Sequence, residues 1–176
     1  MPRWVPNALT AARLVAIIPF ALLLSSAPQA VSVPAAAIFA VASATDFLDG
    51  YLARHAHLQS RFGRIADPAA DRLLVDVALV LLVVHERLAW WLAVPVFGRD
   101  VGLALVFRVR HELTAVQVNR AGKGATALIM LGLLLLMLTR ASWPLWVYSG
   151  GVALSLAAGG LYLLRPDGEE LPSRPS

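Results

Sequence analysis

The chain contains no cysteine, which excludes disulfide bonds and metal sites built from thiolates. Charge is scarce as well, because Asp, Glu, Lys and Arg together make up only 15% of the 176 residues. Hydrophobic residues make up 59%, and the mean hydropathy is +0.70. This balance excludes an ordinary soluble domain and is typical of a membrane protein.

Apolar segments of about 20 residues, the length that a helix needs to cross a bilayer, recur along the chain. We find no internal repeat and no separate polar module between them. We therefore predict an all-α, polytopic membrane protein with six transmembrane helices in a single domain, residues 1–165, followed by a polar tail, residues 166–176. The predicted helices lie near residues 8–27, 32–53, 68–84, 88–107, 122–139 and 143–164.

The basic residues are distributed unevenly between the two ends of these segments. With the amino terminus inside, the outer loops hold only Arg87 and Arg140, and all other loop and terminal Lys and Arg lie on the inner side. Cationic loops stay cytoplasmic, so we expect an integral plasma (inner) membrane protein with both termini in the cytoplasm. The net charge of +4 then faces the anionic inner leaflet, and we expect membrane lipids rather than a nucleic acid as partners.

The first apolar segment also fits a secretory signal peptide loosely. Arg3 precedes an apolar core at Leu14–Leu24, which the small residues Ser25–Ala27 follow. Pro28 would then come directly after the favoured cleavage point, and the later segments would hold the protein in the bilayer in either case. We therefore expect this segment to be a membrane span.

Two aspartates near the end of the second segment stand out, because a charge within a span is costly unless it is paired or used. Asp46 and Asp49 share one helix face, and Gly50 and Ala53 complete an arc of roughly 100° on that face. The small residues leave room for a phosphate and a nucleotide close to the helix backbone. Arg54 beside this face offers a planar guanidinium to a phosphate, although an interfacial anchor explains it equally well.

A second pair of aspartates, Asp67 and Asp71, lies one helical turn apart where the third segment begins, and Pro68 suits a first turn. A short loop favours antiparallel neighbours, so the two pairs should face each other at the cytoplasmic side. Four carboxylates repel one another unless some are protonated or cations lie between them, and oxygen ligands select hard divalent ions. We expect Mg²⁺ or Mn²⁺, because two such ions about 4 Å apart can clamp both oxygens of a phosphoryl displacement.

The run from Asp46 to Asp71 resembles the signature of the CDP-alcohol phosphatidyltransferase family, D-x-x-D-G-x-x-A-R-x8-G-x3-D-x3-D, at every fixed position. The resemblance implies a homodimeric six-helix membrane fold with a cavity facing the cytoplasm. It further implies that Asp46, Asp49 and Asp67 ligate two metal ions, and that Asp71 is both a metal ligand and the general base. The CDP site that it implies consists of Asp46, Asp49, Gly50, Ala53, Arg54, Gly63 and Asp67.

The reaction implied by the resemblance is the transfer of a phosphatidyl group from CDP-diacylglycerol to an alcohol. Asp71 would take the proton of the acceptor hydroxyl while its oxygen attacks the lipid-linked β-phosphorus and CMP departs.

Outside this run, the resemblance narrows to phosphatidylglycerophosphate synthases, whose acceptor is glycerol 3-phosphate. Pro6–Arg13 resembles their P-N-x-L-T-x-x-R opening, Arg99-Asp100 their A-R-E/D run, and Gly122-Lys123 the G-K start of their fifth helix. The acceptor phosphate needs cationic partners, although positive-inside topology alone explains roughly half of the available ones. The candidates are Arg99, Arg108, Arg110, Arg120 and Lys123.

Several alternatives remain open at this point. Cardiolipin synthases, which use phosphatidylglycerol, and inositol-phosphate transferases share the same core signature. A cation-coupled transporter is the chief alternative outside the enzymes, but its carboxylates should lie near the bilayer midplane in repeated, broken helices. Intramembrane prenyltransferases also use aspartate pairs with Mg²⁺, but they resemble longer bundles than 176 residues allow.

Overall fold

The computed structural model describes residues 5–56, 63–109 and 120–163, and the side chains within 11–45, 72–99, 101–102 and 122–159. These residues form six α-helices and no strand, which confirms the predicted all-α class and the order of the elements. The predicted tail, residues 166–176, lies outside the described part. The helices are α1 (Val5–Ser25), α2 (Val33–Ala56), α3 (Gly63–Val84), α4 (Trp90–Val109), α5 (Arg120–Leu138) and α6 (Pro144–Leu163), with a short 3₁₀ helix η1 (Pro28–Ala30) after α1.

The helix bounds follow the predicted apolar segments closely except at α3. That helix begins at Gly63, whereas the prediction placed its start at residue 68. The prediction followed the apolar run, but the first turns of a helix can be polar when they are not packed in an apolar layer. Within the residues that the structure describes, no helix is both long enough and apolar enough to cross a membrane.

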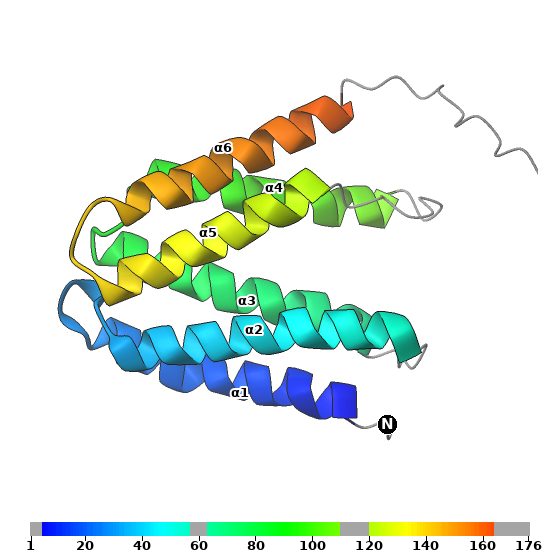
Figure 1. Ribbon diagram of the computed structural model, residues 1–176, viewed down its shortest axis with the longest axis horizontal. Coiled ribbons are helices and arrows are strands. Elements are labelled where there is room, and N and C mark those ends of the chain that lie inside the picture. Colours follow the sequence, from blue (N-terminus) through cyan, green and yellow to red (C-terminus); the bar gives the residue numbers. More distant parts are fainter. Residues whose placement is uncertain (1–4, 57–62, 110–119, 164–176) are drawn as a thin grey trace, which may run out of the picture.

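Successive helices run in opposite directions, so the bundle has two distinct ends (Figure 1). We call the end where α2 finishes and α3 begins the motif end, because it carries both halves of the aspartate signature. The opposite end, formed by the connections at residues 26–32, 85–89 and 139–143, is the turn end. At the turn end the amino ends of α2, α4 and α6 meet the carboxyl ends of α1, α3 and α5.

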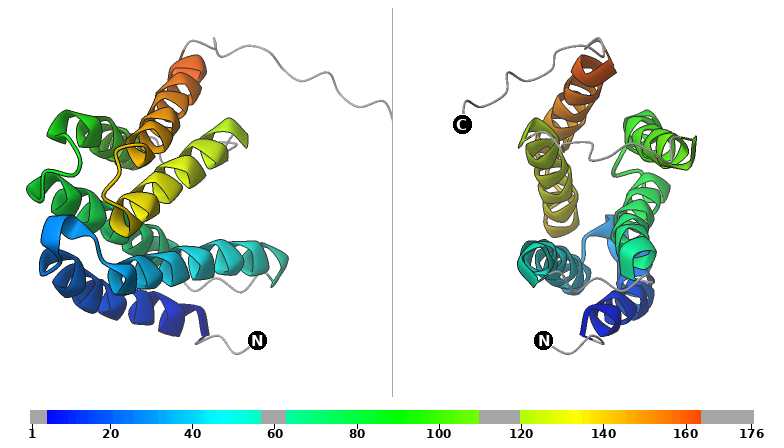
Figure 2. Two further views of the ribbon diagram at one scale, coloured as in Figure 1. Left: turned by 60° about the vertical axis from the view of Figure 1, so that its left-hand side comes forward. Right: turned by 90° about the vertical axis from the view of Figure 1, so that its right-hand side faces the viewer.

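The helices form two closely packed groups, with α1 against α2 and α3, and α5 along α6 (Figures 1 and 2). The rings of Phe20 and Phe39 lie 5.9 Å apart between α1 and α2 and are completely or almost completely buried. Leu79 of α3 and Leu133 of α5 extend the same core. These apolar contacts fix the position of α2 relative to α1 and α3, the helices around the aspartate signature.

Glycine allows α5 and α6 to approach each other closely. A Cβ atom added to Gly132 would lie 2.7 Å from the Cα atom of Tyr148, and one added to Gly151 would lie 2.8 Å from the backbone nitrogen of Ile129. Small residues at such crossings let the backbones of packed helices come together. The fully buried Tyr148 also donates a hydrogen bond of 3.0 Å from its hydroxyl to the carbonyl oxygen of Leu92, which ties α6 to α4.

Side chains bridge the helices at the turn end. The Arg87 guanidinium donates to the carbonyl oxygens of Arg140 at 3.0 Å, of Leu136 at 3.4 Å and of Thr139, so it caps the carboxyl end of α5. Burial, and secondarily the charge of Arg140, lowers the pKa of Arg87. The ring of His85 lies between the carbonyl oxygens of Leu81 and Ser25, and thereby joins α3 to the end of α1.

The start of α2 is fixed by Ser32. Its hydroxyl oxygen accepts a hydrogen bond of 3.3 Å from the backbone N–H of Ala35, which is the usual arrangement of a helix N-cap. The backbone N–H of Ser32 donates to the carbonyl oxygen of Met137 at 2.9 Å. The turn end of α2 is therefore tied to α5, while its other end carries the first two aspartates of the signature.

Candidate active site

The two halves of the aspartate signature lie on consecutive antiparallel helices. Asp46, Asp49, Gly50, Ala53 and Arg54 belong to the second half of α2, and these are backbone placements because their side chains lie outside the described part. The first turns of α3 contain Gly63, Asp67 and Asp71, and these too are backbone placements. The fold therefore brings both halves to the motif end, as the sequence predicted, while the contacts of the carboxylates stay a prediction.

Two of the four aspartates, Asp46 and Asp71, are recessed from the described ends of their helices. Asp46 precedes Ala56, the last residue of α2, by ten residues, and Asp71 follows Gly63, the first residue of α3, by eight. At a rise of 1.5 Å per residue, both backbones lie about 12–15 Å along the helices from the motif end.

Arg99 is the one acceptor-phosphate candidate whose hydrogen bonding the structure describes. It lies ten residues before Val109, the last residue of α4, and therefore at a depth similar to that of Asp46. The side chain is half-buried, and its Nη1 donates a hydrogen bond of 2.8 Å to the hydroxyl of Ser155 in α6. Ser155 carries no sequence signal for this role, because the contact depends on how α4 and α6 are rotated against each other.

The other cationic candidates lie nearer the helix ends. Arg108 is in the last turn of α4, and Arg120 and Lys123 are in the first turn of α5, with Lys123 exposed. Arg110 falls outside the described residues. Arg108, Arg120 and Lys123 therefore belong to the ends of α4 and α5 that lie at the motif end.

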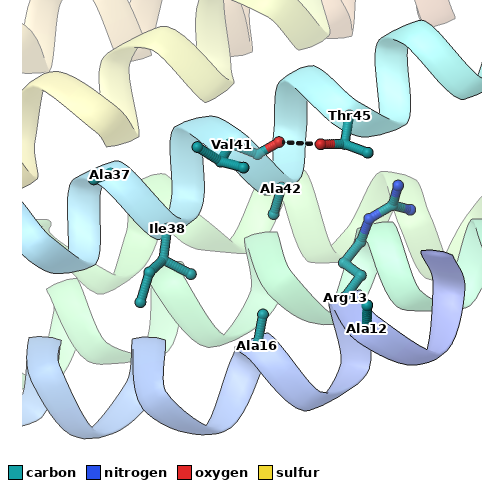
Figure 3. A pocket seen from close by; sticks show the side chains of 8 residues that line it. All are labelled: Ala12, Arg13, Ala16, Ala37, Ile38, Val41, Ala42 and Thr45. Atoms are coloured by element: carbon teal, nitrogen blue, oxygen red, sulfur yellow. Dashed lines mark hydrogen bonds between the residues drawn. The ribbon is translucent and has the colours of Figure 1, made fainter. Parts of the chain in front are cut away.

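A pocket of about 440 Å³ lies between α1 and α2 (Figure 3). Arg13 in its wall is almost completely buried, with a relative exposure of 6%. Arg13 ends the amino-terminal run Pro6–Arg13, but the sequence predicted no role for it. Thr45 also lines the pocket, donates 2.6 Å to the carbonyl oxygen of Val41, and directly precedes Asp46. The lining residues are Ala12, Arg13, Ala16, Ala37, Ile38, Val41, Ala42 and Thr45.

The donor set predicted for divalent cations consists of carboxylates alone. Asp46, Asp49, Asp67 and Asp71 come from two neighbouring helices and bring no His or Cys, which suits Mg²⁺ or Mn²⁺ better than zinc. Among the residues with described side chains, no other group of three or more His, Asp or Glu could hold a metal ion.

Sequence comparisons agree with this geometry. Residues 3–159 match the family profile described as CDP-alcohol phosphatidyltransferase. A CDP-diacylglycerol–glycerol-3-phosphate 3-phosphatidyltransferase of Pseudomonas fluorescens is 39% identical over 170 residues, covering 90% of this chain and 84% of the relative. The Escherichia coli (strain K12) protein of the same name is 37% identical over 168 residues, covering 90% and 88%. A chloroplastic/mitochondrial relative from Arabidopsis thaliana is 37% identical over 139 residues, covering 70% of this chain and 47% of the relative.

The chain belongs to the CDP-alcohol phosphatidyltransferase family. It is therefore a phosphatidyltransferase enzyme, and the transporter and prenyltransferase alternatives are excluded. The family is generally dependent on divalent metal ions, which agrees with the carboxylate donor set.

Proposed function

We propose that the protein transfers the phosphatidyl group of CDP-diacylglycerol to glycerol 3-phosphate, forming phosphatidylglycerophosphate and releasing CMP. The observation that carries this proposal is the complete aspartate signature, divided between α2 and α3 at the same end of the bundle. The names of the relatives in Pseudomonas fluorescens and Escherichia coli support glycerol 3-phosphate as the acceptor.

In this mechanism Asp71 accepts the proton of the acceptor hydroxyl. The hydroxyl oxygen then forms a bond to the lipid-linked β-phosphorus, and the bond from this phosphorus to the bridging oxygen breaks so that CMP leaves. Asp46, Asp49, Asp67 and Asp71 would hold two divalent ions, Mg²⁺ or Mn²⁺, which would supply positive charge to stabilise the reacting phosphate and the departing CMP. Gly50, Ala53 and Gly63 leave space for the cytidine diphosphate, and Arg54 donates to it.

Arg99 is the best-placed residue for the phosphate of glycerol 3-phosphate. Its depth in α4 matches that of Asp46 in α2, and the hydrogen bond to Ser155 limits the movement of its guanidinium. A guanidinium can bind two phosphate oxygens at once, which would orient the acceptor hydroxyl toward the β-phosphorus. Arg108, Arg110, Arg120 and Lys123 would attract the anion to the entrance.

We propose that the bundle is embedded in the inner membrane with its motif end toward the cytoplasm, and that it forms a homodimer. Every helix exposes large apolar side chains, including Val15 on α1, Val80 on α3 and Leu131 on α5, which a water-soluble surface would not repeat on all helices. At the turn end, Trp90 and Trp146 are largely exposed, as aromatic residues at a membrane interface are. The dimer rests on the family resemblance.

The test is acceptor-dependent CMP release by the detergent-solubilised protein. Reactions contain CDP-diacylglycerol, Mg²⁺ or Mn²⁺, and one acceptor at a time: glycerol 3-phosphate, phosphatidylglycerol or inositol phosphate. We expect CMP only with glycerol 3-phosphate, and none after chelation with EDTA. CMP release without any acceptor would contradict a transferase, and turnover with phosphatidylglycerol alone would identify a cardiolipin synthase instead.

A further inference from the structure

Two side-chain hydrogen bonds join α4 to α6, and they are in register. The Tyr148 hydroxyl donates to the carbonyl oxygen of Leu92 at 3.0 Å, and Nη1 of Arg99 donates to the Ser155 hydroxyl at 2.8 Å. In both pairs the partners are 56 positions apart, so the two bonds are separated by seven residues on each helix. Seven residues are almost two complete helical turns, or about 10 Å. The helices run in the same direction from the turn end and are joined at two levels (Figure 1).

Pro95 lies in α4 between these two levels. A proline has no backbone N–H, so the carbonyl oxygen of Trp91 loses its usual helical donor, and the proline ring crowds that carbonyl. The turn that contains Trp91 and Leu92 is therefore short of one backbone hydrogen bond. Neighbouring helices commonly supply a donor to such a turn in a membrane protein, and here the Tyr148 hydroxyl is that donor. Tyr148 thus supports α4 where the hydrogen bonding of its own backbone is interrupted.

Tyr148 is suited to hold α4 because it is itself fixed in position. Its side chain is completely buried, and a Cβ atom added to Gly132 would lie 2.7 Å from its Cα atom, so its backbone packs directly against α5. Ala93 and Val96, on either side of the proline, are buried as well. A closely packed side chain has few alternative positions. The hydrogen bond therefore connects α4 to the tightly packed pair of α5 and α6.

Arg99 comes one helical turn after Pro95. Helices bend at prolines, so the direction of the segment that carries Arg99 depends on what fixes α4 beside Pro95. The bond from Arg99 to Ser155 also requires the two helices to stay in register, because hydrogen bonds weaken steeply with distance and angle. Tyr148 maintains this register from the other side of Pro95. Loss of its hydroxyl should move Arg99 and leave the aspartates of α2 and α3 in place.

We propose that Tyr148 is a positioning residue for the acceptor site. By donating to Leu92 it fixes α4 at Pro95, and it thereby holds Arg99 at the level of Ser155. This role rests on the proposed function, in which Arg99 binds the phosphate of glycerol 3-phosphate. Tyr148 acts through α4 and does not itself contact the substrate.

Tyr148→Phe tests this role, because it removes the hydroxyl alone. We expect KM for glycerol 3-phosphate to rise about threefold to tenfold, as for the loss of one hydrogen bond, and KM for CDP-diacylglycerol to stay constant. Thr126→Val is the control, since the Thr126 hydroxyl donates to the carbonyl oxygen of Gly122 within α5 and joins no second helix. It should leave both KM values unchanged. Equal increases in both KM values of Tyr148→Phe, or the same increase in Thr126→Val, would overturn the proposal.

A second background tests whether Tyr148 acts through the proline. Pro95→Ala restores the backbone donor to the carbonyl oxygen of Trp91, so α4 no longer depends on the hydroxyl at this turn. In a double-mutant cycle, we expect Tyr148→Phe to change KM for glycerol 3-phosphate less than about twofold when residue 95 is alanine. An effect of the same size in both backgrounds would contradict the proposed action through Pro95.

A distance measurement without substrate separates this proposal from the proposed function. Because the chain has no cysteine, Val101→Cys and Leu156→Cys allow one spin label on α4 beyond Pro95 and one on α6, both at exposed positions. In pulsed electron resonance, we expect Tyr148→Phe to widen the distribution of distances between the labels and Thr126→Val to leave it unchanged. An unchanged distribution in Tyr148→Phe would overturn the proposal. A wider distribution in a protein that transfers nothing to glycerol 3-phosphate would retain the support of α4 and refute the proposed reaction.

Discussion

The two ends of the bundle differ in what their polar groups do. At the turn end, Arg87 caps α5, His85 joins α1 to α3, and Ser32 ties α2 to α5 through hydrogen bonds to backbone groups. At the motif end, the polar residues are those of the aspartate signature, for which we propose metal and substrate binding. The proposed catalytic groups are therefore separated along the helices from the polar groups that hold the turn end together. Substitutions at one end should change stability, and those at the other should change turnover.

The largest expected effect is at the motif end. Asp71→Asn removes the proposed general base and a metal ligand, so we expect kcat to fall by about 10²–10⁴-fold or more. The thermal midpoint in detergent should stay close to that of wild type. Activity is measured as CMP release with saturating glycerol 3-phosphate. If the Asp71→Asn protein retained wild-type turnover, Asp71 would not be the general base.

The next largest effect should be at the glycine contact of α5 with α6. Gly132→Ala places a Cβ atom 2.7 Å from the backbone of Tyr148, and overpacking of this kind typically costs about 1–3 kcal/mol. Gly124→Ala on the same helix is the matched control, since no atom lies within 4 Å of its added Cβ. We expect a lower thermal midpoint for Gly132→Ala and an unchanged or higher one for Gly124→Ala. Similar midpoints for the two variants would contradict the close packing.

At the turn end, Arg87→Gln should destabilise the fold without impairing catalysis. The variant leaves carbonyl oxygens at the end of α5 without their cationic donor, which typically costs about 1–3 kcal/mol. We expect a lower thermal midpoint but an unchanged KM for both substrates at low temperature. Arg140→Gln, at an exposed position, serves as the control and should unfold at or slightly above the wild-type midpoint, because it removes a positive charge beside Arg87 while the backbone carbonyl that Arg87 contacts remains. A lower kcat or a higher KM in the folded Arg87→Gln protein would contradict the expectation that polar groups at the turn end affect stability alone.

The smallest effect concerns the hydrogen bond that orients Arg99. Ser155→Ala removes the hydroxyl 2.8 Å from Nη1 of Arg99, and the loss of one such bond corresponds to a change of about 3- to 10-fold in affinity. We expect KM for glycerol 3-phosphate to rise by this factor while KM for CDP-diacylglycerol stays constant. Steady-state kinetics with each substrate varied in turn separates the two. A rise only in KM for CDP-diacylglycerol would indicate that Arg99 binds the donor rather than the acceptor.

The sequence predicted the helices well but not their contacts. Apolar runs are sufficient to locate six helices and their order, because a helix satisfies its own backbone and needs no distant partner. The start of α3 was placed at residue 68 rather than Gly63, since its first residues are polar and the apolar run begins later. The pairing of Gly132 with Tyr148 could not be predicted, because it depends on the rotation and spacing of two separate helices.

The candidate site was predictable where its residues are close in sequence. Asp46 to Asp71 form a continuous signature, whose fixed spacing identifies the chemistry without a structure. The hydrogen bond between Arg99 and Ser155 joins residues 56 positions apart, and Arg13 and Thr45 line the same pocket only because α1 and α2 are antiparallel. Such relations have no local sequence pattern, so the structure was needed to pair Arg99 with Ser155 and to place Arg13 in the wall of this pocket.

The most direct measurement follows both products of the reaction. The purified protein is incubated with CDP-diacylglycerol, Mn²⁺ and radiolabelled glycerol 3-phosphate, and the label in the organic phase is compared with the CMP in the aqueous phase. We expect equal amounts of phosphatidylglycerophosphate and CMP, and neither product with EDTA or with Asp71→Asn. CMP that accumulates while the label stays in the aqueous phase would contradict the transfer of a phosphatidyl group to glycerol 3-phosphate.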